Sequence, residues 1–297
     1  MAAGPRPARC NVLPTWAMQA EGKTMKTGLV ALLALFALVV TGCASTGSSS
    51  PSASGTGPLP NLNGREISVA VENAYLPFNY IDPTTKQGAG WDYDAVAEIC
   101  KRLNCKPKFI ETGWDGMIQA VANGQYDIAA DGITITAERA EVVAFSRGYI
   151  SVEQRLMVGK TETRFSSLAG FKSGTFVVGT QIGTTNYETA KKEYTEGRIK
   201  AFDQFAFAVQ ALINGDVDAV IIDSTAGQGY VGENADKIKL LDGSLSSDRL
   251  GFVFPLKSDL VVPVNAALTA MEADGTLAKL ADKFFSSKFT LTYDDLK

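Results

Sequence analysis

Residues 126–139 read Y-D-I-A-A-D-G-I-T-I-T-A-E-R, and a shorter copy of this pattern recurs 91 residues further along the chain. The copies cover residues 123–131 and 214–223 and differ in length by one residue. In each copy Asn-Gly ends an apolar helical run, and a short apolar strand then leads to an aspartate. Ligands of open α/β sheets bind beyond the carboxyl ends of the strands, so the repeat predicts two similar lobes facing a shared cleft. Arg139 and Asp223 are the natural charged pair of such a cleft, which suits a zwitterion.

Strand-like and helical segments alternate along the rest of the chain. The first series has strands at 66–71, 108–110 and 126–130 and helices at 93–103, at 115–122 and from Ala137. The second series has strands at 175–179, 199–202 and 218–222 and helices at 184–194 and 205–213. Extended runs at 149–158 and 250–254 lie at the two ends of the second series, and helices at 259–273 and 276–285 follow.

This order predicts an α/β fold of two lobes, each with a mostly parallel sheet flanked by helices. Residues 65–152 and 250–297 are expected to form lobe 1, and residues 153–249 lobe 2. The chain leaves lobe 1, completes lobe 2 and returns. Its two crossing segments form a two-strand hinge, which permits the lobes to close without unfolding.

The N-terminal region resembles a secretion signal. Residues 29–40 are an apolar run too short to span a bilayer but typical of a signal-peptide core. The run ends in V-T-G-C, which resembles a bacterial lipobox; the alternative is a free cysteine near an anchor helix. We interpret residues 25–42 as a lipoprotein signal peptide, Cys43 as the lipidation site and residues 1–24 as an upstream mis-start. The Ser-, Gly- and Pro-rich residues 43–64 are then a flexible tether.

Composition excludes several functions. The chain has 28 Lys+Arg against 32 Asp+Glu and no polybasic block, which argues against nucleic acid and anionic lipid as partners. It has no histidine, which removes imidazole acid–base chemistry and the common nucleophile pairs. It also lacks a Walker loop, and we expect no cofactor and no metal.

Cys100 and Cys105 are the two cysteines of the predicted folded body. The first lies at a predicted helix end and the second enters the next strand. An extracytoplasmic compartment allows them to form a disulfide, and two buried thiols are the alternative.

Seven segments resemble the extracellular solute-binding proteins of family 3, the amino-acid-binding proteins of bacterial ABC importers. They occur in family order, as A-Y-L-P-F-N-Y-I-D (74–82), G-W-D-Y-D-A-V-A-E-I (90–99), W-D-G-M-I (114–118), the stretch at 126–139, F-S-R-G-Y (145–149), Q-I-G-T-T (181–185) and D-A-V-I-I-D (218–223). The resemblance implies a periplasmic-binding-protein type II fold.

The resemblance also implies which residues hold the α-amino and α-carboxylate groups of a ligand. Arg139 matches the arginine that grips the α-carboxylate, for which a planar guanidinium is suited. Thr134 matches a donor to the same carboxylate, and Thr185 lies where a helix N-terminus favours an anion. Gly132 matches a backbone acceptor for the α-ammonium, and Asp223 the aspartate that pairs with it.

Tyr75 and Trp114 match two aromatic residues that sandwich the ligand side chain. Glu72 and Asp131 match positions at its distal end, where Gln181 and Ile222 join them from lobe 2. Two carboxylates there favour a cationic side chain. Arg147 stands where the family commonly has aspartate, and its pairing with either acid would cancel that preference.

The sequence is thus interpreted as a lipid-anchored, extracytoplasmic and monomeric binding protein that delivers a polar amino acid to an ABC permease. Arginine or lysine is expected first and glutamine next. Two alternatives stay open: a dehydratase of the prephenate or arogenate type on the same fold, and a sensor module for a signalling partner.

Overall fold

The computed structural model describes residues 58–293, 295 and 296. The predicted mis-start (1–24), the signal peptide (25–42) and Cys43 lie outside the described residues. Among the helices of the described part, none combines the length and the apolar character that a membrane span requires.

The end of the predicted tether belongs to the folded body. Leu59 and Leu62 pack against the main hydrophobic core, and the backbone N–H of Leu62 donates to the carbonyl of Leu103 at 2.7 Å. The prediction that the tether extends to Gly64 is therefore wrong for residues 58–64, because Leu59 and Leu62 supply apolar surface that packs against the core.

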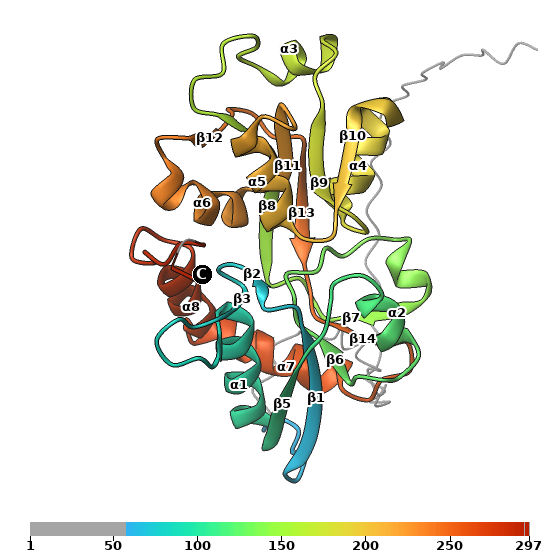
Figure 1. Cartoon of the computed structure of the whole chain (residues 1–297). Helices are drawn as coiled ribbons and strands as arrows, with labels where there is room; N and C mark the ends of the chain where they lie inside the picture. The colour runs from blue at the N-terminus through green and yellow to red at the C-terminus, as the bar shows by residue number, and fades with distance from the viewer. Residues whose placement is uncertain (1–57, 294, 297) are drawn as a thin grey trace, which may run out of the picture. The chain divides into compact units, whose positions relative to one another are not determined.

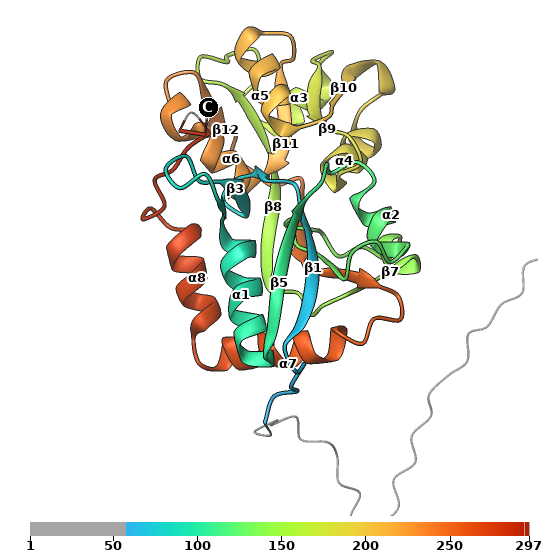
Figure 2. The same ribbon diagram turned by 60° about the horizontal axis from the view of Figure 1, so that its bottom comes forward.

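The first lobe contains a five-stranded sheet in the order β5-β1-β6-β14-β7, in the lower half of Figure 1. Its strands are β1 (Arg65–Val71), β5 (Cys105–Glu111), β6 (Ile128–Ala129), β7 (Val143–Phe145) and β14 (Val253–Pro255). Its helices are α1 (Trp91–Leu103), α2 (Met117–Ala122), α7 (Val261–Ala273) and α8 (Thr276–Phe284), with a 3₁₀ turn η1 at Arg139–Glu141. A small sheet of β2 (Ala74–Tyr75), β3 (Asn79–Ile81) and β4 (Gly88–Ala89) adjoins it. Helix α1 packs along β5, and α8 lies beside α1 (Figure 2).

The second lobe contains a sheet in the order β10-β9-β11-β8-β12, with β13 also paired to β8. Its strands are β8 (Ile150–Gly159), β9 (Val178–Gln181), β10 (Ile199–Phe202), β11 (Ala219–Asp223), β12 (Ile238–Leu240) and β13 (Ser246–Leu250). Its helices are α3 (Leu168–Ser173), α4 (Thr185–Glu193), α5 (Phe205–Asn214) and α6 (Ser224–Val231), and η2 (Glu196–Arg198) and η3 (Gly232–Asn234) are 3₁₀ turns.

Each sheet has one strand that runs against the others. In the first lobe it is β14, which is antiparallel to β6 and β7, and in the second lobe it is β8, which is antiparallel to β11, β12 and β13. The other strands point their carboxyl ends toward the opposite lobe. The strands that have just crossed the hinge must run away from the cleft, so they are reversed. Each sheet is therefore mixed: all of its strands but one share a direction, and the hinge accounts for the exception.

The sequence repeat is also a structural repeat. In the first copy, Asp127 accepts hydrogen bonds from the backbone N–H and hydroxyl of Ser68 in β1, at 2.9 and 2.7 Å. In the second copy, Asp218 accepts from the backbone N–H of Val177, next to β9, at 2.7 Å. Each aspartate thus ties the start of its strand to the neighbouring parallel strand and sets the register between them.

Several predicted elements differ in detail. The helix expected from Ala137 is only the 3₁₀ turn η1, and the extended run at 250–254 is two strands that Gly251 separates. Helices α3 and α6 and the small sheet β2–β4 were not predicted, since short amphipathic segments and two-residue strands give weak periodicity.

The sulfur atoms of Cys100 in α1 and Cys105 at the start of β5 are joined as a disulfide. The bridge closes a sharp turn in which Asn104 takes the left-handed conformation, with φ of 53°. It links the end of α1 to the edge strand of the first sheet.

Gly90 fixes the start of α1 against the small sheet. It is the N-cap of the helix, with φ of 125°, and a Cβ there would lie 2.3 Å from the carbonyl oxygen of Phe78. That oxygen accepts the backbone N–H of Asp92 at 2.9 Å, so it is not free to move away.

Replacing Gly90 with alanine should therefore destabilise the protein by about 2–4 kcal/mol, through backbone strain and a clash with a fixed carbonyl. Thermal unfolding should show the midpoint lowered by roughly 4–16 °C. Gly113→Ala is the matched control, because no atom lies within 4 Å of a Cβ there. If the two variants unfold at the same temperature, the account of Gly90 is wrong.

Candidate ligand-binding site between the lobes

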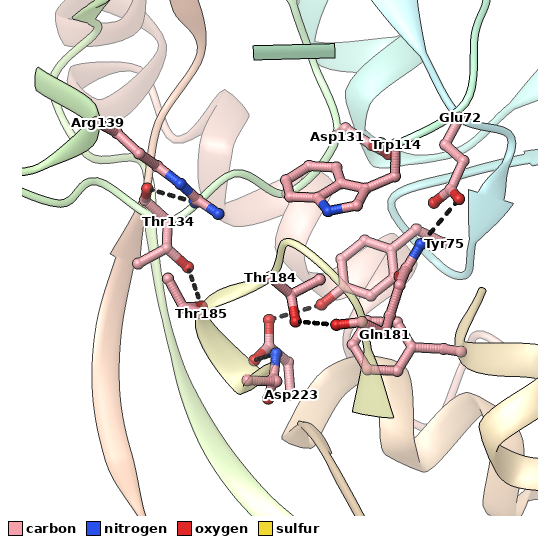
Figure 3. Close-up of a pocket in the computed structure, with 13 residues that line it drawn as sticks. Glu72, Tyr75, Trp114, Asp131, Thr134, Arg139, Gln181, Thr184, Thr185 and Asp223 are labelled. Carbon is pink, nitrogen blue, oxygen red and sulfur yellow. Dashed lines mark hydrogen bonds between the residues drawn. The ribbon is translucent and has the colours of Figure 1, made fainter. Parts of the chain in front are cut away.

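A pocket with about 330 Å³ of empty space lies where the two lobes meet. All ten residues predicted for the site line it: Glu72, Tyr75, Trp114, Asp131, Gly132, Thr134, Arg139, Gln181, Thr185 and Asp223. Figure 3 shows Arg139, Thr134 and Thr185 at one end and Glu72 with Gln181 at the other. The rings of Trp114 and Tyr75 lie between these ends.

At the first end, Arg139 holds a half-buried positive charge. Its guanidinium donates to the carbonyl of Thr134 at 3.0 Å and to the carbonyl of Gly183, in the other lobe, at 3.3 Å. Burial lowers the pKa of Arg139 to about 10, which leaves it cationic at neutral pH. The hydroxyls of Thr134 and Thr185 are hydrogen-bonded across the cleft at 3.2 Å. Donors from both lobes therefore converge on one place, where an anion would be stabilised.

Asp223 is the last residue of β11 and the N-cap of α6, so the end of the strand presents its carboxylate to the pocket. The carboxylate accepts from the hydroxyl of Tyr75 across the cleft at 2.6 Å and from the amide of Asn186 at 3.1 Å. Burial raises its pKa to about 6, so it is mostly ionised at neutral pH. It provides a negative charge on the second-lobe side of the pocket.

The middle of the pocket is aromatic. The guanidinium carbon of Arg139 lies 5.5 Å from the centre of the Trp114 ring, and Tyr75 stacks on Phe205 of α5 with ring centres 5.8 Å apart. Gly132 permits this arrangement, since its φ is 56° and a Cβ there would lie 2.7 Å from the Tyr75 ring. The rings give the pocket flat apolar walls between two polar ends.

Glu72 and Asp131 occupy the far end. Glu72 accepts from the side-chain amide of Gln181 across the cleft at 3.0 Å, and the same amide donates to the carbonyl of Asp203 at 2.9 Å. Burial raises the pKa of Glu72, and the neighbouring Asp131 raises it further. Burial also raises the pKa of Asp131. A cation or a hydrogen-bond donor would stabilise the ionised form of both carboxyls.

Arg147 lies elsewhere. It forms an ion pair with Glu272 of α7, and its guanidinium donates to Thr269 at 2.9 Å. Its backbone N–H donates to Asn265 at 2.7 Å. It therefore does not neutralise Glu72 or Asp131. Ile222, named as a neighbour of the distal end, is fully buried in the core and does not line the pocket.

Three pocket residues lay outside the predicted set. Thr184 caps α4, accepting from the backbone N–H of Tyr187 at 3.1 Å and donating to the carbonyl of Gln181 at 2.7 Å. Asn186 lies in the first turn of the same helix, next to the predicted Thr185. Its position beside Thr185 could have identified it as a pocket residue. Phe205 sits in an apolar helical run, where nothing separates a pocket aromatic from a core one. No group of three or more potential metal ligands occurs among the described residues.

This chain is similar to a known protein family and to several of its members. Residues 67–287 match the family described as bacterial extracellular solute-binding proteins, family 3. The L-cystine-binding protein TcyA of Bacillus subtilis is 29% identical over 221 residues, covering 74% of this chain and 81% of that protein. The arginine-binding periplasmic protein of Mannheimia haemolytica is 28% identical over 232 residues, covering 74% and 91%.

Among solved structures, an ancestral arginine-binding protein bound to glutamine aligns with a TM-score of 0.69 and 33% identity, covering 74% of this chain and 97% of that one. These relatives are named as binding proteins rather than as enzymes. The family match spans most of the chain and includes every residue that lines the pocket. The chain therefore belongs to the bacterial extracellular solute-binding proteins of family 3.

Proposed function

We propose that this protein captures a polar amino acid in the cleft for an ABC importer, with arginine or lysine favoured and glutamine next. One observation carries the proposal: a half-buried guanidinium and a buried carboxylate lie near one end of an aromatic pocket, and two further carboxyls lie at the other. That charge pattern is complementary to an amino acid with a cationic side chain.

The first end suits the groups that all amino acids share. Arg139 pairs with the α-carboxylate through both of its terminal nitrogens, and the hydroxyls of Thr134 and Thr185 donate to the same group. Asp223 pairs with the α-ammonium, which also donates to the carbonyl of Gly132. These partners come from both lobes, so the ligand favours the closed arrangement by binding it better than an open one.

The far end selects the side chain. A guanidinium or ammonium lies between Trp114 and Tyr75 and reaches Glu72 and Asp131, gaining cation–π contact and charge-assisted hydrogen bonds. Glutamine keeps the neutral hydrogen bonds, including those to Gln181. Glutamate would add a third carboxylate to a buried acidic site, where like charges cost several kcal/mol.

The amino acid is handed to an ABC permease, and the protein is held at the outer face of the cytoplasmic membrane by lipid on Cys43. The lipobox-like V-T-G-C and the polar segment that follows it support this part of the proposal. A lipid anchor leaves the binding lobes free to meet the permease.

Arg139→Ala should weaken binding of every amino-acid ligand by about 2–5 kcal/mol, since the α-carboxylate loses its charged partner. Arg139→Lys keeps the charge but lacks the planar fork of the guanidinium. Its affinity should therefore lie between those of the wild type and Arg139→Ala. Isothermal calorimetry measures the affinities, and thermal unfolding without ligand controls for stability. Unchanged affinity in Arg139→Ala would place the carboxylate elsewhere.

Calorimetry of the wild-type protein should rank the ligands as arginine or lysine, then glutamine, then glutamate. The ranking follows from the acids at the far end, and Asp131→Asn should narrow the gap between arginine and glutamine. Tightest binding of glutamate, or of a purely apolar amino acid, contradicts the assignment of Glu72 and Asp131.

Cys43→Ser should abolish lipidation and leave the protein unprocessed or released from the membrane, because acyl chains dominate its attachment. Membrane fractionation and labelling with a fatty-acid analogue measure both effects in cells of a bacterial host. Cys10→Ser, ahead of the predicted start, is the matched control and should behave as wild type. A Cys43→Ser protein that is still lipid-labelled refutes the anchoring site.

A further inference from the structure

A third buried carboxyl lies behind the pocket and is linked to Asp131. The side-chain amide of Asn79 donates to Oδ2 of Asp92 at 3.0 Å and to Oδ1 of Asp131. Its oxygen accepts the backbone N–H of Asn73 at 2.7 Å, which fixes the orientation of the amide. Asn79 and Asp92 are both 0% exposed and do not line the pocket. One asparagine thus holds two carboxyls, of which only Asp131 reaches the ligand space.

Glu72, Asp131 and Asp92 form a buried acid group without a cation. They are 8%, 3% and 0% exposed, and Oδ2 of Asp131 has no hydrogen-bond partner. Within the described residues, the lysine and arginine ion pairs involve other acids. The other titratable groups that face the acids are tyrosines whose pKa values burial raises, so they stay neutral: Tyr75, Tyr93, Tyr149, Tyr230 and Tyr293.

Burial is the first cause of a raised pKa for all three acids, and a neighbouring carboxyl adds to it for Glu72 and Asp92. Buried carboxylates at close range cannot all ionise without a compensating cation. At least one proton therefore resides in the group near neutral pH. The net charge of this acid group therefore depends on which ligand enters the pocket.

We propose that this acid group makes the ligand preference of the pocket depend on pH, because a cationic side chain binds with release of a proton from the Glu72–Asp131 pair and a neutral amide side chain binds without it. The O–H bond of one carboxyl breaks, its proton passes to the solvent, and the resulting carboxylate pairs with the guanidinium or ammonium. Asn79 is a positioning residue that aims Asp131 at the ligand. The inference rests on the proposed amino-acid binding.

The direction of the pH effect follows from the protonation state of the Glu72–Asp131 pair that each ligand needs. The carboxyls hold protons below their raised pKa values and lose them above, so affinity for a cationic side chain rises with pH. A glutamine amide donates to a carboxylate or accepts from a carboxylic acid, so its affinity depends less on this pair. Asp223, whose pKa is about 6, pairs with the α-ammonium of both ligands, so its titration cancels in the ratio of their affinities.

The test is isothermal calorimetry of the mature protein with arginine and with glutamine from pH 5 to pH 8. Acetate or MES buffers the lower pH values, and between pH 7 and pH 8 each titration is run in both phosphate and Tris, whose ionisation enthalpies differ. The ratio of arginine to glutamine affinity should rise by about tenfold or more across this range. Arginine binding near neutral pH should release up to about one proton, seen as a buffer-dependent enthalpy, and glutamine binding should release essentially none.

Variants separate the roles of the residues. Asp131→Asn should flatten the pH dependence of the affinity ratio while glutamine still binds. Asn79→Ala removes a hydrogen bond that lowers the pKa of Asp131, so it should shift the rise to higher pH. Asp115→Asn removes an exposed carboxylate next to Trp114 and is the matched control, with the wild-type profile expected. If Asn79→Ala does not fold, Asp131→Asn still decides.

Parallel pH profiles for the two ligands, with no buffer dependence for arginine, overturn the inference and leave amino-acid binding intact. Failure of both ligands to bind at every pH overturns the proposed function itself. If only one ligand binds, its profile between pH 7 and pH 8, where Asp223 is already ionised, decides: arginine must still tighten with pH and release a proton, and glutamine must do neither.

Discussion

Four direct contacts between polar groups, most of them buried or half-buried, join the two lobes at the pocket. Tyr75 donates to Asp223, Gln181 donates to Glu72, Arg139 reaches the carbonyl of Gly183, and the hydroxyls of Thr134 and Thr185 meet. Buried polar groups that lack partners cost free energy. The closed arrangement is therefore favourable only because each lobe satisfies the other's groups, and an amino acid offers the same kinds of charge and hydrogen bond.

The topology explains why these groups meet. Both sheets point most of their strands toward the cleft, and Asp223 and Gln181 are the last residues of β11 and β9. Glu72 directly follows β1, and Asp131 lies two residues beyond β6. Charged side chains at the strand ends of one lobe thus face those of the other without any long loop. The repeated aspartates at 127 and 218 keep their strands in register with the neighbouring strands.

Much of this arrangement was predictable from the sequence. The helix-stop, strand and aspartate pattern is local, so it indicated two lobes and a cleft, and all ten residues expected in the site line the pocket. The features that could not be predicted depend on tertiary contacts. In the sequence, Phe205 is indistinguishable from a core residue, and only the structure shows that Tyr75 stacks on it. The link of Asn79 and Asp92 to Asp131 could not be predicted either, because they lie 52 and 39 positions away in sequence. The packing of Leu59 and Leu62 was missed for the same reason.

The acids beyond the aromatic walls distinguish this pocket from one that only recognises the amino-acid backbone. In the proposed account, their burial makes specificity an electrostatic property, set by how many protons the group holds, as well as a matter of shape. Arg147, which stands where the family commonly has aspartate, pairs with Glu272 and leaves that property unaltered.

A crystal structure of the protein grown with arginine tests the account most directly. The account predicts the α-carboxylate on Arg139, the α-ammonium on Asp223, and the guanidinium between Trp114 and Tyr75 within hydrogen-bonding distance of Glu72 or Asp131. Arginine bound in the reverse orientation, or outside the cleft, would contradict it.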